Sequence, residues 1–203
     1  YWHALPKDWE DLTYHQFLDE RRVLMAKVTR DGFKQLVRGE IVEEKPATLE
    51  QMILQGEGIY TEFKSTLRVN LHTGEKDKRM EHASLKTING FLNSKEGGHL
   101  VIGLDDKGAA LGLSNDKFEN EDKMDLHLGN LIKSQLGVST MLHIKAHFED
   151  YDGERVLLVE CKPSKVPVYL KVGQEEEFYI RAGGSSAKLT PSQMIEYVKQ
   201  RFN

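Results

Sequence analysis

Helical and strand patterns alternate along the first part of this chain and then give way to a run of strands. Helical spacing or a capping box predicts helices over residues 11–38, 48–55, 80–93 and 122–136 and from residue 190 onward. Strand patterns occupy residues 59–67, 100–104, 142–148, 155–161, 168–172 and 178–181. This order predicts one α/β (α+β) domain with a mixed sheet flanked by helices, and it does not match a doubly wound fold.

Turn residues in the second half of the chain predict hairpins. The turn at residues 150–153 joins the alternating segments 142–148 and 155–161. We expect residues 168–172 and 178–181 to form a second pair of this kind. The polar stretch at residues 70–78 is predicted to be a loop.

The N-terminal part differs from the rest. Residues 11–38 predict an amphipathic helix with a basic surface, and a Glu-rich connection follows that ends at Pro46. We therefore expect a helical segment and linker over residues 1–46 and the α/β domain over residues 47–203.

Composition excludes several classes of protein. Apolar residues make up 39% of the chain and charged residues 30%, which is typical of a soluble globular protein. The longest apolar run, residues 100–104, is far shorter than a membrane span, so we expect no membrane partner and a cytoplasmic location. The single cysteine, Cys161, excludes an internal disulfide and a Cys-rich zinc site.

The net charge of -4 does not by itself favour a nucleic-acid partner, because domains that bind nucleic acid are often strongly basic. A local basic patch can still meet phosphate on an acidic protein. Any nucleic-acid function must therefore be argued from a site.

Three acidic residues are candidates for such a site. Glu57 lies in a Gly-flanked turn, Glu62 lies within a strand pattern, and Asp106 follows the apolar strand at 100–104. Carboxylates that converge at strand ends are typical ligands for Mg²⁺ or Mn²⁺, and such ions can activate water against a phosphodiester. Lys64 shares a strand face with Glu62 and is placed to hold a phosphate. The alternative is that these are a solvated strand residue and an ordinary turn.

Three ordered blocks of this sequence carry recognisable motifs. Residues 57–64 (EGIYTEFK) contain a Glu-x4-Glu-Phe-Lys pattern. Residues 91–108 (FLNSKEGGHLVIGLDDKG) join a helix, a Gly-Gly turn, a buried strand and an Asp-Asp pair. Residues 178–186 (FYIRAGGSS), before a capped helix, are similar to a Tyr-x-Arg-x-Gly-Ser ending. Together the three blocks resemble the Schlafen family.

The resemblance implies an AlbA-like domain of bacterial type that acts on nucleic acid. In those Schlafen proteins that are ribonucleases, the two Glu and the second Asp form a metal-binding triad that cleaves structured RNA such as tRNA. Carried over, the catalytic and metal-ligating residues are Glu57, Glu62 and Asp106, with Lys64 beside them. Those ribonucleases pair two such lobes, so a homodimer is a candidate assembly. They also carry a Cys/His zinc site, which this chain does not provide.

Basic residues supply the candidate phosphate contacts. The candidates for nucleic-acid binding are Lys64, Arg68, Lys78, Arg79 and Arg181. Residues 183–186 (GGSS) form either an anion-binding nest or a plain loop. No Gly-x4-Gly-Lys-(Ser/Thr) motif occurs, so no nucleotide cofactor is predicted.

Three functional hypotheses follow. The first is a divalent-metal-dependent endonuclease, a hydrolase that uses Mg²⁺ or Mn²⁺ and prefers RNA to DNA. The second is a non-catalytic DNA- or RNA-binding regulatory module. The third is a sensing or interaction domain of a larger bacterial defence or restriction-type protein.

Overall fold

The computed structural model describes residues 46–202 together with Thr13 and Arg22. The chain divides into two compact units, Tyr1–Glu44 and Lys45–Asn203. The helix predicted over residues 11–38 lies outside the described residues, apart from Thr13 and Arg22. Within the described residues, no helix is both long enough and apolar enough to span a membrane.

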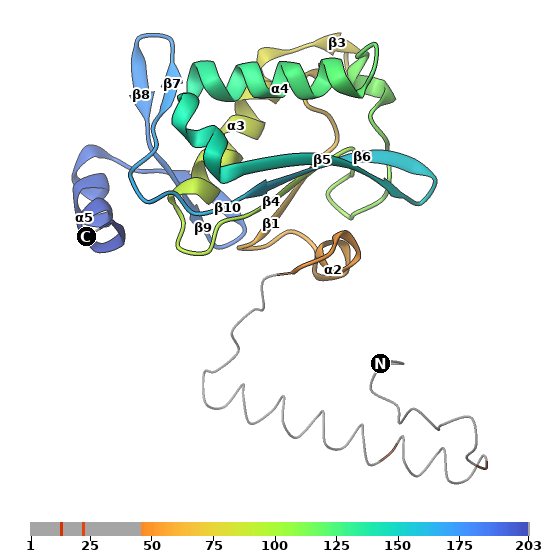
Figure 1. The fold of residues 1–203 in the computed structure, drawn as a ribbon, viewed down its shortest axis with the longest axis horizontal. Coiled ribbons are helices and arrows are strands. Elements are labelled where there is room, and N and C mark those ends of the chain that lie inside the picture. Colours follow the sequence, from red (N-terminus) through yellow and green to blue (C-terminus); the bar gives the residue numbers. More distant parts are fainter. Residues whose placement is uncertain (1–12, 14–21, 23–45, 203) are drawn as a thin grey trace. The chain divides into compact units, whose positions relative to one another are not determined.

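A four-stranded mixed sheet forms the centre of the domain (Figure 1). Its order is β1-β4-β6-β5, with bounds Thr61–Lys64, Gly98–Ile102, Glu154–Cys161 and Ile144–Tyr151. β1 and β4 are parallel, while β6 pairs antiparallel with β4 and with β5. The mixed sheet predicted from the order of the elements is confirmed, and so is the hairpin between residues 142–148 and 155–161.

Helices cover both faces of this sheet. α2 (Leu49–Gln55) lies on one face, and α3 (Lys78–Asn93) and α4 (Glu121–Gln135) lie on the other (Figure 1). Two short 3-10 turns, η3 (Ser114–Asp116) and η4 (Val138–His143), flank α4, and α5 (Pro191–Arg201) ends the chain. Asn120 caps α4 by accepting from the amide of Lys123, and Thr190 and Gln193 form the expected capping box of α5.

Alternation along β4 explains how one strand serves two hydrophobic cores. Every residue of β4 is buried. Leu100 and Ile102 pack in the core beneath α3 and α4, whereas Val101 packs with Met52 of α2. Successive strand residues point to opposite faces, so a continuous apolar run belongs in a strand that is covered on both sides.

The small hairpins differ from those predicted. The expected loop at residues 70–78 contains β3 (Glu75–Lys76) and the last residue of its partner strand, β2 (Val69–Asn70). Residues 168–172 were predicted to pair with 178–181, and this is wrong. Instead β7 (Leu170–Val172) pairs with β8 (Glu175–Glu177), and β9 (Tyr179–Ala182) pairs with β10 (Ser185–Lys188).

Turn glycines explain the correct pairing. Gly173 and Gly183 both have positive φ, 64° and 60°, which a glycine adopts without strain, and each closes a tight turn within its own hairpin. The run of glutamates at residues 175–177 has no apolar alternation, so its strand was not visible in the sequence.

Two buried asparagines attach the C-terminal strands to α3. The side-chain amide of Asn93 donates to the carbonyls of Val168 (2.9 Å) and Tyr179 (3.0 Å), and its oxygen accepts from the Val168 amide (2.9 Å). The oxygen of Asn89 accepts from the Tyr179 amide (3.0 Å). These bonds satisfy backbone groups that no strand pairing would satisfy in this buried region.

Candidate functional site

β1 places the first candidate residues. Phe63 points into the core beneath α2, so Glu62 and Lys64 point to the opposite face of the sheet. Lys64 is in register with Ile102 of the parallel neighbour β4. The two strands therefore end at the same edge, and Asp106 comes from the turn that follows β4.

This shared edge carries a pocket of about 300 Å³. Lys64 and Asp106 both line it, and the Asp106 side chain is exposed. The other polar residues of its lining are Ser65, Thr66, Asn70 and His72. We call this the β1–β4 pocket. It joins a cation, a carboxylate and several hydrogen-bonding side chains.

Glu62 is held between two cations. Its Oε1 lies 2.6 Å from Lys64 Nζ, and its Oε2 lies 2.7 Å from Arg181 Nη1. The Glu62 side chain is only 15% exposed. Both carboxylate oxygens are thus engaged, which leaves Glu62 as the centre of an ion-pair network.

Arg181 is buried in this network. Its side chain is 1% exposed and also donates to the carbonyls of Gly58 (3.1 Å) and Thr61 (3.0 Å). Its guanidinium lies 5.0 Å from the centre of the Phe91 ring of α3. Arg181 therefore joins β9 to β1 and α3 as a structural clamp. Contact with a phosphate, as predicted for this residue, would require it to leave these partners.

Glu57 supports the start of β1. Its Oε1 accepts a hydrogen bond from the Phe63 amide at 2.8 Å, which folds the glycine-flanked turn back along the strand. The turn between β9 and β10 lies close to the same place, because a Cβ on Gly184 would be 3.9 Å from the Cα of Gly58. The first and third sequence blocks are thus brought together.

The other predicted phosphate ligands differ in how strongly they are held. Arg68 donates to the carbonyls of Asp116 and Lys117 (2.8 Å each) and lies 3.4 Å from the centre of the Phe118 ring. Arg79 is 82% exposed and pairs with Asp77, whose pKa it lowers to about 2 through side-chain and backbone hydrogen bonds. Lys78 is exposed at the start of α3.

Asp116 has a structural role that the sequence did not suggest. It is buried, and its carboxylate accepts from the backbone amides of Leu67 (2.7 Å), Arg68 (2.8 Å) and Val69 (3.2 Å). It thereby fixes the segment that leaves β1 beside the β1–β4 pocket. An aspartate in a Ser-Asn-Asp turn has an ordinary turn composition, so only the tertiary contact distinguishes it.

The predicted triad does not form a ready metal centre in this arrangement. Among residues 46–202, no three His, Cys, Asp or Glu side chains are grouped so that they can hold a metal ion. Lys64 and Arg181 place two positive charges beside Glu62, and these charges would oppose the approach of a divalent cation. β1 connects three of the candidates: Lys64 pairs with Glu62, and the Phe63 amide between them donates to Glu57. Asp106 is related to them by lining the β1–β4 pocket together with Lys64.

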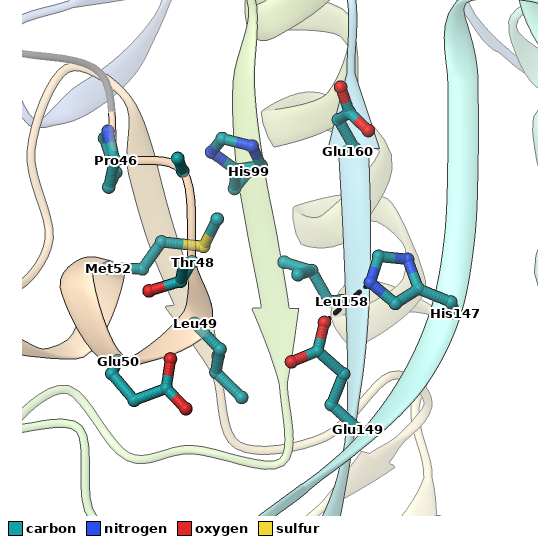
Figure 2. A pocket seen from close by; sticks show the side chains of 11 residues that line it. Pro46, Thr48, Leu49, Glu50, Met52, His99, His147, Glu149, Leu158 and Glu160 are labelled. Atoms are coloured by element: carbon teal, nitrogen blue, oxygen red, sulfur yellow. Dashed lines mark hydrogen bonds and ion pairs between the residues drawn. The ribbon is translucent and has the colours of Figure 1, made fainter.

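A second, larger pocket lies on the opposite face of the sheet, the face covered by α2. Its volume is about 640 Å³. Figure 2 shows His99 of β4 and His147 and Glu149 of β5 across from Met52 of α2, with His147 and Glu149 joined at 2.7 Å. No sequence motif predicted this pocket, because its lining comes from residues 46–48, α2, β4, β5 and β6.

Comparison with known proteins identifies the family. The family model "Schlafen, AlbA_2" matches residues 57–190. No curated protein matches the chain. Among solved structures, the DIP2311 protein from Corynebacterium diphtheriae is 17% identical with a TM-score of 0.51, and the alignment covers 91% of this chain but only 30% of that one, so the similarity concerns the fold.

The N-terminal domain of a RecG-related protein from Nitrosomonas europaea is 23% identical over 64% of this chain and 82% of that one. The TM-score of this pair is 0.41. The family match extends over well more than half of the chain and includes all three sequence blocks. It ends just before the final helix, α5. The chain therefore belongs to the Schlafen AlbA_2 family.

Proposed function

We propose that this domain binds nucleic acid and that the β1–β4 pocket contacts the phosphate backbone. The observation that carries the proposal is the meeting of Lys64 with Ser65, Thr66 and Asn70 in one pocket at the end of β1. Membership of the Schlafen AlbA_2 family, a domain type associated with nucleic acid, supports the same conclusion.

The chemistry of the pocket suits a phosphodiester. An ammonium group pairs with a phosphate oxygen, and hydroxyl and amide side chains donate to phosphate and sugar oxygens. Lys64 is 27% exposed, so its ammonium can reach a ligand while it remains near Glu62. Because the chain carries a net charge of -4, the attraction must be local to this surface.

A salt titration tests the proposal. Binding of single-stranded and structured RNA and of DNA is measured by fluorescence anisotropy over a range of salt concentrations. Phosphate contact predicts that the logarithm of the affinity falls linearly with the logarithm of the salt concentration. Lys64→Gln is expected to weaken binding and to reduce the slope by about 1.

The matched control is Lys133→Gln, an exposed lysine of α4 outside the pocket. Equal effects of the two variants, or no binding, would contradict the proposal.

Metal-dependent cleavage is the second candidate, with RNA favoured over DNA and Mg²⁺ or Mn²⁺ as the ion. The observation that favours it is that Asp106 and Lys64 line the same pocket. Lys64 belongs to β1, the strand that also carries Glu62, and the Phe63 amide of this strand donates a hydrogen bond to Glu57. The two ion pairs of Glu62 make binding without cleavage the better supported of the two functions.

Two nearly isosteric variants separate the candidates. Asp106→Asn changes an exposed side chain, and Glu57→Gln retains an oxygen that can accept from the Phe63 amide. Each is incubated with tRNA, rRNA and single-stranded DNA in Mg²⁺, in Mn²⁺ and in a chelator. An endonuclease would be supported if the wild type cleaves the nucleic acid and both variants bind it without cleaving it. Cleavage that is equal in all three proteins would come from a contaminant and would exclude it.

A further inference from the structure

β5 is a long strand at the edge of the central sheet. It has eight residues and pairs with β6 along its whole length without a bulge. Among the described residues, the sheet order ends at β5, and no strand pairs with its other side. A regular edge strand without proline presents unpaired backbone groups, which is the usual template for pairing with another strand.

The hydrogen bonding of the hairpin shows which residues face outward. Just before the strand, the Lys162 amide donates to the His143 carbonyl at 2.7 Å, in line with the register that pairs Ile144 with Cys161. Hydrogen-bonded pairs alternate in an antiparallel ladder. The odd-numbered residues of β5 therefore bond to β6, and the backbone groups of the even-numbered residues point to the free edge.

Side-chain direction is set by the same alternation. His147 and Glu149 line the pocket on the α2 face, and Lys145 shares their parity and is exposed. Ala146 and Phe148 pack against the core on the α3 face. The α2 face of β5 thus carries a lysine and a glutamate on either side of His147.

We infer that the free edge of β5 pairs with β5 of a second copy of this chain, antiparallel and centred on His147. A two-fold axis perpendicular to the sheet keeps each side chain on its own face, so residues of equal parity must pair. Centring on His147 pairs Ala146 with the partner's Phe148, and both present backbone groups at the free edge. It also pairs Lys145 with the partner's Glu149.

The charge pattern of the strand favours a second copy over an unrelated strand. Lys145 and Glu149 lie two positions before and after the centre, so the two-fold axis creates the same attractive pair twice. These residues form non-hydrogen-bonded pairs, in which the side chains approach most closely. Within its own sheet Glu149 lies opposite the apolar Val156, whereas Lys145 lies opposite Glu160.

The inferred contact also affects the larger pocket. Glu149 lines that pocket and is bonded to His147, as Figure 2 shows. Lys145 of the partner subunit would approach this glutamate from the free edge. The second copy would therefore contribute a cation to the rim of each pocket, across the sheet from the β1–β4 pocket.

Charge reversal provides a test with an internal rescue. Analytical ultracentrifugation is performed on the 203-residue chain. The wild type is expected to dimerise. Lys145→Glu and Glu149→Lys should each raise the dimer dissociation constant by roughly tenfold or more, since each places like charges opposite one another across the strands. An equimolar mixture of the two variants should form a heterodimer, because both cross-strand pairs become attractive again.

The matched controls are Lys171→Glu and Glu176→Lys, which lie opposite each other in the separate β7–β8 hairpin and should leave the dimer unchanged. A second measurement uses only the wild type. Amide exchange at Ala146 and Phe148 should slow as protein concentration rises, while exchange at His147 should not depend on concentration. The inference would be overturned by a monomeric wild type or by a dimer whose dissociation constant changes in neither charge-reversal variant. Fast amide exchange at Ala146 and Phe148 at every protein concentration would also overturn it.

Discussion

At the scale of single residues, Arg181 is a buried cation that holds several parts of the domain together. Its side chain is 1% exposed and bonds to Glu62, Gly58 and Thr61. A buried guanidinium with several acceptors is a structural group, because its removal leaves a carboxylate and carbonyls without donors.

Arg181→Ala is therefore expected to destabilise the domain by about 3 kcal/mol, as for other broken buried ion pairs. Arg181→Lys should also destabilise it, since an ammonium cannot reproduce the planar fork that reaches several acceptors. Urea unfolding followed by circular dichroism measures both. The control is Arg79→Ala, whose ion pair with Asp77 is exposed and should matter much less. Similar losses for Arg181→Ala and Arg79→Ala would contradict the clamp.

Glu177 predicts a pH dependence of stability. Burial raises the pKa of its carboxyl. Hydrogen bonds from Lys188 (2.5 Å) and Tyr179 (2.8 Å), together with the positive charges of Lys188 and His82, lower the pKa overall. A pKa that is lower in the folded state adds stability above the unfolded-state pKa, and this stability is lost as pH falls through the folded-state pKa.

Glu177→Gln should consequently lose less stability on acidification than the wild type does. The measurement is the free energy of unfolding at neutral pH and at several acidic values, compared between the two proteins. Glu175→Gln, an exposed neighbour at the start of β8, serves as the control. An unchanged pH profile in Glu177→Gln would show that its hydrogen bonds do not contribute in this way.

At the scale of elements, α3 organises the domain by holding both the sheet and the C-terminal strands. Its apolar face packs on β4, and its buried asparagines bond to the backbone at Val168 and Tyr179. The hairpin of β9 and β10 can then present Arg181 to β1. The position of that hairpin therefore depends on side-chain hydrogen bonds as well as on apolar packing.

Asn93→Ala should destabilise the domain by about 2 kcal/mol or more, because the Val168 and Tyr179 backbone groups lose their buried partner. Asn130→Ala, an exposed asparagine of α4, is the control and should be nearly neutral. Thermal and chemical unfolding measure both. In Asn93→Ala, faster amide exchange in β9 is also expected, and unaltered exchange there would argue against the attachment described.

At the scale of the whole molecule, the two hydrophobic cores of the described residues are built between Leu49 and Tyr179. A chain that begins at residue 45 should therefore fold cooperatively by itself, with a single unfolding transition. Calorimetry of this shorter chain beside the 203-residue chain checks the expectation. A shorter chain without a cooperative transition would show that residues 1–44 are required for folding.

The sequence by itself determined the family of this protein and several of its elements, whereas β2, β3, β8 and β10 were not predicted. A continuous apolar run located β4, alternation located β5 and β6, capping residues located the starts of α2 and α5, and the ordered blocks pointed to a Schlafen domain. These signals are local, since the period of a segment reports which side chains share a face. The sequence also placed Asp106 just after the strand at residues 100–104 and Lys64 on the same strand face as Glu62, but it did not place Lys64 and Asp106 in one pocket.

Only the tertiary structure decided which groups meet and which are buried. Glu62 and Arg181 are 119 positions apart, and no periodicity reports that one neutralises the other. The role of Asp116 likewise depended on backbone amides 47 to 49 positions away. A local pattern reports the face on which a side chain lies, whereas its partner across that face is set by how the whole chain packs.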